Sequence, residues 1–487
     1  MRLIRSAKGV AGMAAALSLA ACSLAPEYHR PETPAPPAFK EAGEWKRAEP
    51  ADEAPKGEWW KRFGDPVLND LEDKLGGANQ GLKAAFARFQ QARAVVRIAH
   101  ADTLPQVSVN GAGRRQRVSQ TLAFPNQPAN FSDYALSADV SYEIDVWGRV
   151  RSSLESAKDK AEAGAGDLAT TDLGLRADLA DDYFALRGFD TQQHILDETV
   201  IAFAAALDLT GRRHEGGVQP AADVAQAEGQ LETARTQAAE NLLRRAQMEH
   251  AVAILVGEPP EQFSLPPQPF DNRPPPPVEA GLPSALIERR PDVAAAERRV
   301  AAANADIGVA RAAFFPVFTL DSMLGLDSAT PRRFFQAQST IWSLGSSAAV
   351  ALFDGGRRDA MTDQARAAYD ETVANYRLTV QTANGEVEDN LAALRLLDRE
   401  ARTQRAAVSA TQRALDQAKL RYTAGLVTYI EVVESENLAL AAQLSAADID
   451  TRRMTSTVQL IKALGGGWDA GTGLELERTA GLPPAAP

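Results

Sequence analysis

The distribution of proline constrains this chain more than any other feature of its sequence. Only Pro220 interrupts residues 151–256, and residues 332–482 contain no proline at all. Proline breaks helices because it lacks a backbone N–H and clashes with the preceding turn. These tracts are rich in Ala, Gln, Glu and Arg, which favour helix. They predict long helices over Arg149–Arg213 and Arg357–Arg421, each about 95 Å long at 1.5 Å per residue.

The two tracts belong to two related halves of the chain. Residues that lie 208 positions apart carry the same or a similar side chain. The matching pairs are Gly148 and Gly356, Arg149 and Arg357, Leu186 and Leu394, Arg187 and Arg395, Arg213 and Arg421, Gly217 and Gly425, Asp223 and Glu431, Val224 and Val432, and Gly257 and Gly465. A register held over so long a stretch indicates an internal duplication, in which each half runs helix, strand pair, very long helix, turn and shorter helix.

Proline-rich segments and the duplication divide the chain into six parts. The expected parts are a signal peptide (1–21), a lipid-anchored proline-rich tether (22–66), a first repeat (67–257), a proline-rich linker (258–281), a second repeat (282–466) and a C-terminal tail (467–487). The linker follows from the eleven prolines between Glu258 and Pro291.

The N-terminus predicts export from the cytoplasm and attachment to a lipid. Arg2, Arg5 and Lys8 precede a short apolar stretch over residues 10–20, which is typical of a signal peptide. The stretch ends at Cys22, the chain's one cysteine, in a sequence that resembles the lipobox of bacterial lipoproteins. That resemblance implies acylation of Cys22, and Ser23 after it favours delivery to the outer membrane. A plain signal peptide with a chance cysteine is the alternative.

Each half also contains segments with strand periodicity. Residues 136–144 alternate apolar and polar side chains, and so do residues 318–324 and 342–352. The alternation after Pro105 is short, at Val107 and Val109. A transmembrane helix over 334–353 is the competing interpretation, but its many Ser and Gln residues oppose it. Four strands cannot close a barrel or satisfy their edges in a bilayer, so several copies must pool their strands.

Composition and motifs exclude several classes of function. The net charge of −12 opposes a nucleic-acid surface, and we interpret Arg114, Arg115 and Arg117 as a solvated loop. One cysteine and five dispersed histidines provide no zinc-ligand spacing. No nucleotide-binding or nucleophile motif is present. We therefore expect no enzyme, no metal and no cofactor other than the lipid on Cys22.

Several stretches resemble the TolC family of outer-membrane efflux proteins, in its OprM/NodT branch. The matching stretches are Cys22–Pro31, Trp59–Phe63, Tyr142–Arg149, Leu282–Ser284, Arg289–Val293, Ala303–Gly308 and Ala313–Pro316. The resemblance implies a mainly α fold with a small β part, in which a homotrimer shares a long α-helical barrel and an outer-membrane β-barrel of four strands per chain. It also implies an exit duct that passes drugs or other toxic small molecules and docks to a periplasmic adaptor and an inner-membrane pump.

The turns after the two long helices hold the candidate functional residues. Gly217 and Gly425 are expected to supply left-handed turns. The family resemblance implies that Glu431 and Glu434 line a constriction, and that Asp223 and Tyr422 join links holding it shut. The alternative is that Asp223 and Glu431 only stabilise a first helical turn. Val427 departs from members with a basic residue there, which puts that ion pair in doubt.

Two other classes of protein remain as alternatives. A periplasmic coiled-coil adaptor or structural lipoprotein without a pore accounts for the helices and Cys22, but not for the alternating strands. An envelope-anchored enzyme would need a catalytic cluster, and the sequence contains none that we recognise.

Overall fold

The computed structural model describes residues 24–33, 38–42, 57–117, 119, 130–270, 274–278 and 290–466. The predicted signal peptide, Cys22 and the tail over 467–487 lie outside these residues. The chain forms two compact units. The first comprises 1–32, 88–164 and 295–377, and the second comprises 33–87, 165–294 and 378–487.

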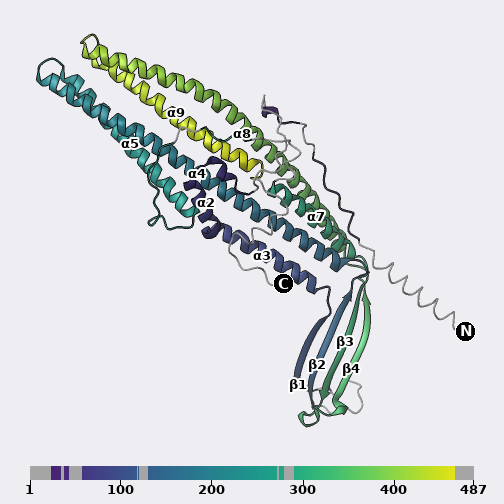
Figure 1. Cartoon of the computed structure of the whole chain (residues 1–487). Helices are drawn as coiled ribbons and strands as arrows, with labels where there is room; N and C mark the ends of the chain where they lie inside the picture. The colour runs from purple at the N-terminus through teal and green to yellow at the C-terminus, as the bar shows by residue number, and fades with distance from the viewer. Residues whose placement is uncertain are drawn as a thin grey trace. The chain divides into compact units, whose positions relative to one another are not determined.

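The chain is mostly helical, as the sequence predicts (Figure 1). The helices are α2 (Pro66–Ala78), α3 (Gln80–Ala101), α4 (Arg149–Glu215), α5 (Ala221–Leu255), α7 (Pro291–Ala312), α8 (Arg357–Thr423) and α9 (Tyr429–Ala463). Short 3-10 helices are η1 (Lys40–Ala42), η2 (Trp59–Phe63), η3 (Pro331–Arg333) and η4 (Ala337–Ser339). The two predicted long helices are confirmed, because α4 and α8 each run unbroken for 67 residues. No helix among the described residues is both long and apolar enough to cross a membrane.

The β part is one antiparallel sheet in the first unit. Its strands are β1 (Gln106–Arg117), β2 (Asn130–Ile144), β3 (Val317–Ser328) and β4 (Thr340–Ala349), and they lie in the order β1-β2-β3-β4. The predicted strand periodicity is confirmed, except that β4 ends at Ala349 rather than at residue 352. The apolar side chains at even-numbered positions from Leu136 to Ile144 share one face of the sheet, on which Ala138 lies between Val109 and Leu324. Among the residues that the structure describes, no strand pairs with the outer edge of β1 or of β4.

Two expectations about β1 are wrong. The strand is not short, since it runs for 12 residues, and the arginines at 114, 115 and 117 lie in it rather than in a loop. Gly111 and Gly113 interrupt the apolar alternation, so the sequence pattern ends early although the backbone pairing continues. The pairing extends to Arg117 opposite Asn130 because β2 offers a partner along its whole length.

The second unit is held together by antiparallel helix pairs. Phe203 of α4 packs with Leu231 and Ala234 of α5. In the other half, Leu397 and Ala401 of α8 pack with Ile449 of α9. Small residues recur at these contacts and allow the helix backbones to approach closely. Each pair consists of a long helix and the helix that follows it in the chain, joined by one turn.

Candidate functional site at two helix turns

The α4–α5 turn and the α8–α9 turn have the same backbone. Gly217 and Gly425 adopt positive φ angles of 71° and 73°, which side-chain-bearing residues rarely tolerate. In the α4–α5 turn the Val218 amide donates to the Arg213 carbonyl at 2.8 Å. In the α8–α9 turn the equivalent Leu426 amide donates to the Arg421 carbonyl at 2.9 Å. Both turns are therefore Schellman caps, in which glycine lets the amides beyond the helix satisfy its last carbonyls.

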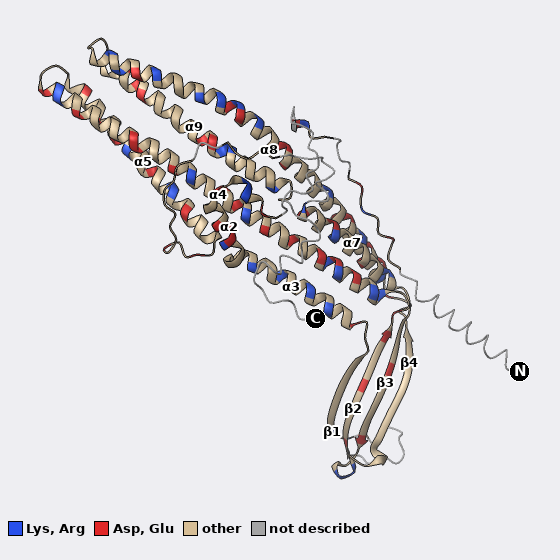
Figure 2. Ribbon diagram, in the orientation of Figure 1, with Lys and Arg blue, Asp and Glu red and all other residues tan. Residues whose placement is uncertain are grey.

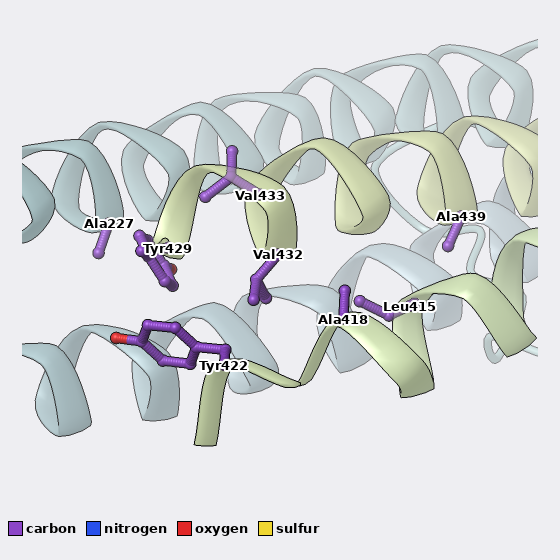
Figure 3. Packing of buried hydrophobic residues seen from close by; sticks show 8 residues of the cluster. All are labelled: Ala227, Leu415, Ala418, Tyr422, Tyr429, Val432, Val433 and Ala439. Atoms are coloured by element: carbon purple, nitrogen blue, oxygen red, sulfur yellow. The ribbon is translucent and has the colours of Figure 1, made fainter. Parts of the chain in front are cut away.

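An apolar cluster fills the space beside the α8–α9 turn (Figure 3). Its buried members are Ala227, Leu415, Ala418, Tyr422, Tyr429, Val432, Val433 and Ala439. Tyr422 and Tyr429 lie on either side of the turn, with ring centroids 5.5 Å apart. Val427 packs against the same cluster. The position at which the sequence lacks a basic residue is thus occupied by an apolar contact.

A polar link joins the two turns through Gln219. The Gln219 side-chain amide donates to the Tyr422 hydroxyl at 2.6 Å and to the Asp223 carboxylate at 3.2 Å. Gln219 lies in the turn between Gly217 and the start of α5 at Ala221, whereas Tyr422 is in the last turn of α8. Asp223 and Tyr422 therefore lie in one network, although no direct hydrogen bond connects them. A second contact also joins the two turns, because the Arg213 guanidinium lies 4.9 Å from the centre of the Tyr422 ring.

The α8–α9 turn also contains an ion pair of its own. Arg421 Nη1 lies 2.5 Å from Glu431 Oε1, and both side chains are partly exposed. Glu434, one turn further along α9, is exposed. Of the two glutamates expected to act together, one is therefore paired with a cation and the other faces solvent.

A buried carboxylate lies deeper in α9. The Glu436 side chain is 4% exposed, and Lys419 of α8 approaches one of its oxygens at 3.2 Å. The other oxygen has no hydrogen-bond partner among the described residues. Burial raises the pKa of Glu436 above its ordinary value, against the opposing attraction of Lys419. α9 thus contains a buried titratable group that the sequence pattern did not single out.

Gln219 is the main residue that the sequence analysis missed. The 208-residue register aligns it with Val427, so the two halves differ in polarity at the equivalent position. That mismatch inside an otherwise matching turn was the available signal. Among the described residues, no group of three His, Cys, Asp or Glu side chains can hold a metal ion.

Comparison with known proteins agrees with this architecture. The sequence model of the outer membrane efflux protein family matches the chain twice, over residues 73–258 and 282–466. The chain belongs to the outer membrane efflux protein family. It is a TolC-family protein, and its two matched segments are the two halves of the helical and strand pattern described above.

Individual relatives match over nearly their whole length. The chain is 34% identical to the outer membrane protein OprJ of Pseudomonas aeruginosa over 97% of this chain and 99% of OprJ. It is 33% identical to the probable efflux pump outer membrane protein TtgC of Pseudomonas putida over 94% of this chain and 95% of that protein. The structure of the outer-membrane channel OprN superposes with a TM-score of 0.84 and 29% identity, covering 92% of this chain and all of OprN.

Proposed function

We propose that this outer-membrane efflux protein is a homotrimeric exit duct of a tripartite system that passes drugs or other toxic small molecules. The observation that carries the proposal is the four-stranded sheet with one apolar face and two edges that no described strand pairs with. Each open edge would leave backbone groups unsatisfied in a bilayer, so β1 of one copy pairs with β4 of the next. Three copies supply twelve strands, and the number three is that implied by the family resemblance.

The decisive experiment combines mass and conductance. The full chain purified in detergent is expected to have the mass of a trimer and to conduct ions in a planar bilayer. A folded monomer that conducts, or a trimer that never conducts, contradicts the proposal. The second result would favour the alternative of a structural lipoprotein or adaptor without a pore.

We propose that the α4–α5 and α8–α9 turns form the periplasmic gate and face the adaptor or the pump. The link from Gln219 to Tyr422 and Asp223 supports this proposal, since it ties together the ends of two helix pairs. In a threefold assembly the exposed Glu434 side chains form an acidic ring, whereas Arg421 partly neutralises Glu431. Acidic rings favour cations and bind multivalent ones.

Ion selectivity separates the two glutamates. Glu434→Ala is expected to reduce cation preference and block by multivalent cations more than Glu431→Ala does. Single-channel recording under a salt gradient measures both quantities. If neither variant changes them, the glutamates only stabilise α9 and do not line the constriction.

We also propose that Cys22 is acylated and attaches the chain to the outer membrane. Support comes from the segment that follows it. The Leu24 carbonyl accepts a hydrogen bond from Arg311 at 3.4 Å, and the Pro26 carbonyl accepts one from Asn304 at 2.8 Å. Arg311 and Asn304 are in α7, the helix that leads into β3. This bonding holds the chain shortly after Cys22 beside the end of α7 that leads into the sheet.

The close approach of this segment depends on Gly308. A Cβ at Gly308 would lie 2.7 Å from the Ala25 Cβ, which is too close for a side chain. Acylation is proposed to serve sorting rather than pore formation. A Cys22→Ala chain exported with a conventional signal should therefore still assemble and conduct, and complete loss of its trimer would contradict this role.

A further inference from the structure

The basic stretch of β1 divides between the two faces of the sheet. Successive strand residues point to opposite faces, so Arg114 points to one face and Arg115 and Arg117 to the other. The register places Arg114 opposite Asp133. Arg115 is opposite Ser132, and Arg117 is opposite Asn130. Only Arg114 has a carboxylate as its cross-strand neighbour.

Arg115 and Arg117 share their face with the sheet's exposed apolar side chains. Val107 and Val109 are on the same face of β1, with 69% and 71% of their surface exposed. Leu324 of β3 and Leu344 of β4 continue this face and are similarly exposed. An apolar face of this extent is typical of contact with lipid or protein. In the barrel proposed above, it is the lipid-facing surface.

The opposite face is polar and contains Asp139 and Asp321, each of which accepts a side-chain hydrogen bond. Figure 2 shows acidic residues along β2 and β3, and basic residues at the loop end of the sheet. The two faces therefore differ in charge as well as in polarity. Arg115 and Arg117 carry positive charge on the apolar face, and no described residue forms an ion pair with either of them.

The loop after β3 adds further positive charge at the same end of the sheet. Arg332 and Arg333 are exposed in η3, which follows the strand end paired with β2 at Tyr134. Phe334 and Phe335 come next, with ring centroids 5.1 Å apart, and Phe335 is 84% exposed. In a transmembrane β-barrel, aromatic residues form a girdle at each of the two membrane–water interfaces. This end of the sheet thus has the composition of a membrane interface.

We propose that Arg115 and Arg117 form a binding site for the phosphate groups of anionic lipid in the outer leaflet, supported by Arg332 and Arg333. This inference rests on the proposed barrel, which places the loop end of the sheet on the outer side. A guanidinium on an apolar face reaches the headgroup region, where it keeps its charge and finds acceptors. Its planar fork binds phosphate oxygens bidentately. Three copies give three such sites around the barrel.

The test measures lipid binding by the full detergent-purified assembly with native mass spectrometry. The probes are bisphosphorylated lipid A and the same lipid with both phosphates removed. Arg115→Gln/Arg117→Gln is expected to weaken binding of the phosphorylated lipid about tenfold or more, because each arginine near an anionic surface contributes on the order of a factor of five. The matched control is Arg114→Gln, which is next in sequence, is on the polar face and should bind like the wild type.

Each outcome decides the proposal. Equal binding by Arg115→Gln/Arg117→Gln and wild type, equal loss in Arg114→Gln, or equal binding of the dephosphorylated lipid overturns it. Displacement by inorganic phosphate at matched phosphate concentration would also overturn it, by pointing to a free anion. Planar-bilayer conductance of every variant separates this failure from failure of the channel itself. A conducting protein without phosphate-dependent lipid binding refutes only the lipid site.

Discussion

The α4–α5 turn and the α8–α9 turn descend from one duplicated pattern, and a comparison of them separates what the turn backbone requires from what the contacts between the turns require. Their glycines have nearly equal φ angles, and their Schellman hydrogen bonds are the same. Their side chains have diverged. Gln219 in one turn corresponds to Val427 in the other, and His214 corresponds to Tyr422.

The divergence makes the turns complementary rather than equivalent. The α4–α5 turn supplies the polar donor, while the α8–α9 turn supplies the tyrosine acceptor and the apolar cluster around it. Two identical valines would leave the Tyr422 hydroxyl without this partner. Glutamine at both positions 219 and 427 would place a polar side chain against the apolar cluster. The duplication thus preserved the helix cap and altered the contacts between the turns.

Tyr422 and His214 should differ most in their contribution to local stability. Tyr422→Ala removes a buried aromatic ring and should destabilise the α8–α9 turn by about 3 kcal/mol. His214→Ala removes an exposed side chain whose ring Nδ1 lies 2.8 Å from the Gln219 carbonyl oxygen, and should have a much smaller effect. Hydrogen–deuterium exchange of the α9 amides measures the loss of local stability in each of the two variants. Comparable exchange in the two variants would contradict the assigned asymmetry.

The two glycines should behave alike. Gly217→Ala and Gly425→Ala each force a Cβ into the left-handed region, which costs about 1–2 kcal/mol. Exchange of the amides that follow each glycine should rise by similar factors in the two turns. A large effect in one turn alone would mean that the shared backbone is not equally required.

Glu436 and its counterpart Glu228 should differ in pH dependence. Because burial raises the pKa of Glu436, the folded state holds its proton more tightly than the unfolded state does. The stability of wild type therefore falls as pH rises from the ordinary glutamate pKa through the raised value. Glu436→Gln should flatten this fall in thermal unfolding midpoints, whereas Glu228→Gln at an exposed position should not. Identical pH profiles for the two variants would refute the assignment.

The smallest expected effect belongs to the exposed ion pair. Arg421→Gln should weaken the α8–α9 turn by only about 0.5 kcal/mol, and less at high salt, since exposed pairs are screened. Arg213→Gln instead removes a cation–ring contact with Tyr422. Hydrogen–deuterium exchange rates of the turn amides, measured at low and at high salt, compare the Arg421→Gln and Arg213→Gln variants. A stronger salt effect on Arg213→Gln than on Arg421→Gln would reverse the assigned roles.

The sequence was sufficient for features that repeat or alternate. Proline spacing predicted α4 and α8, and alternation predicted β2 and β3. It underestimated β1, because pairing with a distant strand, rather than local apolar periodicity, extends it to Arg117. It missed Gln219 for a similar reason, since a single hydrogen bond between turns 203 residues apart leaves no periodic trace.

Single-channel conductance of Gln219→Leu tests the central claim most directly, because the Gln219 side chain hydrogen-bonds both Tyr422 and Asp223. The account predicts a larger conductance than in wild type, as the link between the turns is lost. Tyr422→Phe should give the same increase, and the double variant should give no further increase. Val427→Ala, the matched change in the other turn, should not reproduce this effect. If Gln219→Leu conducts like wild type, or if its effect adds to that of Tyr422→Phe, the two turns are not held together through this hydrogen bond.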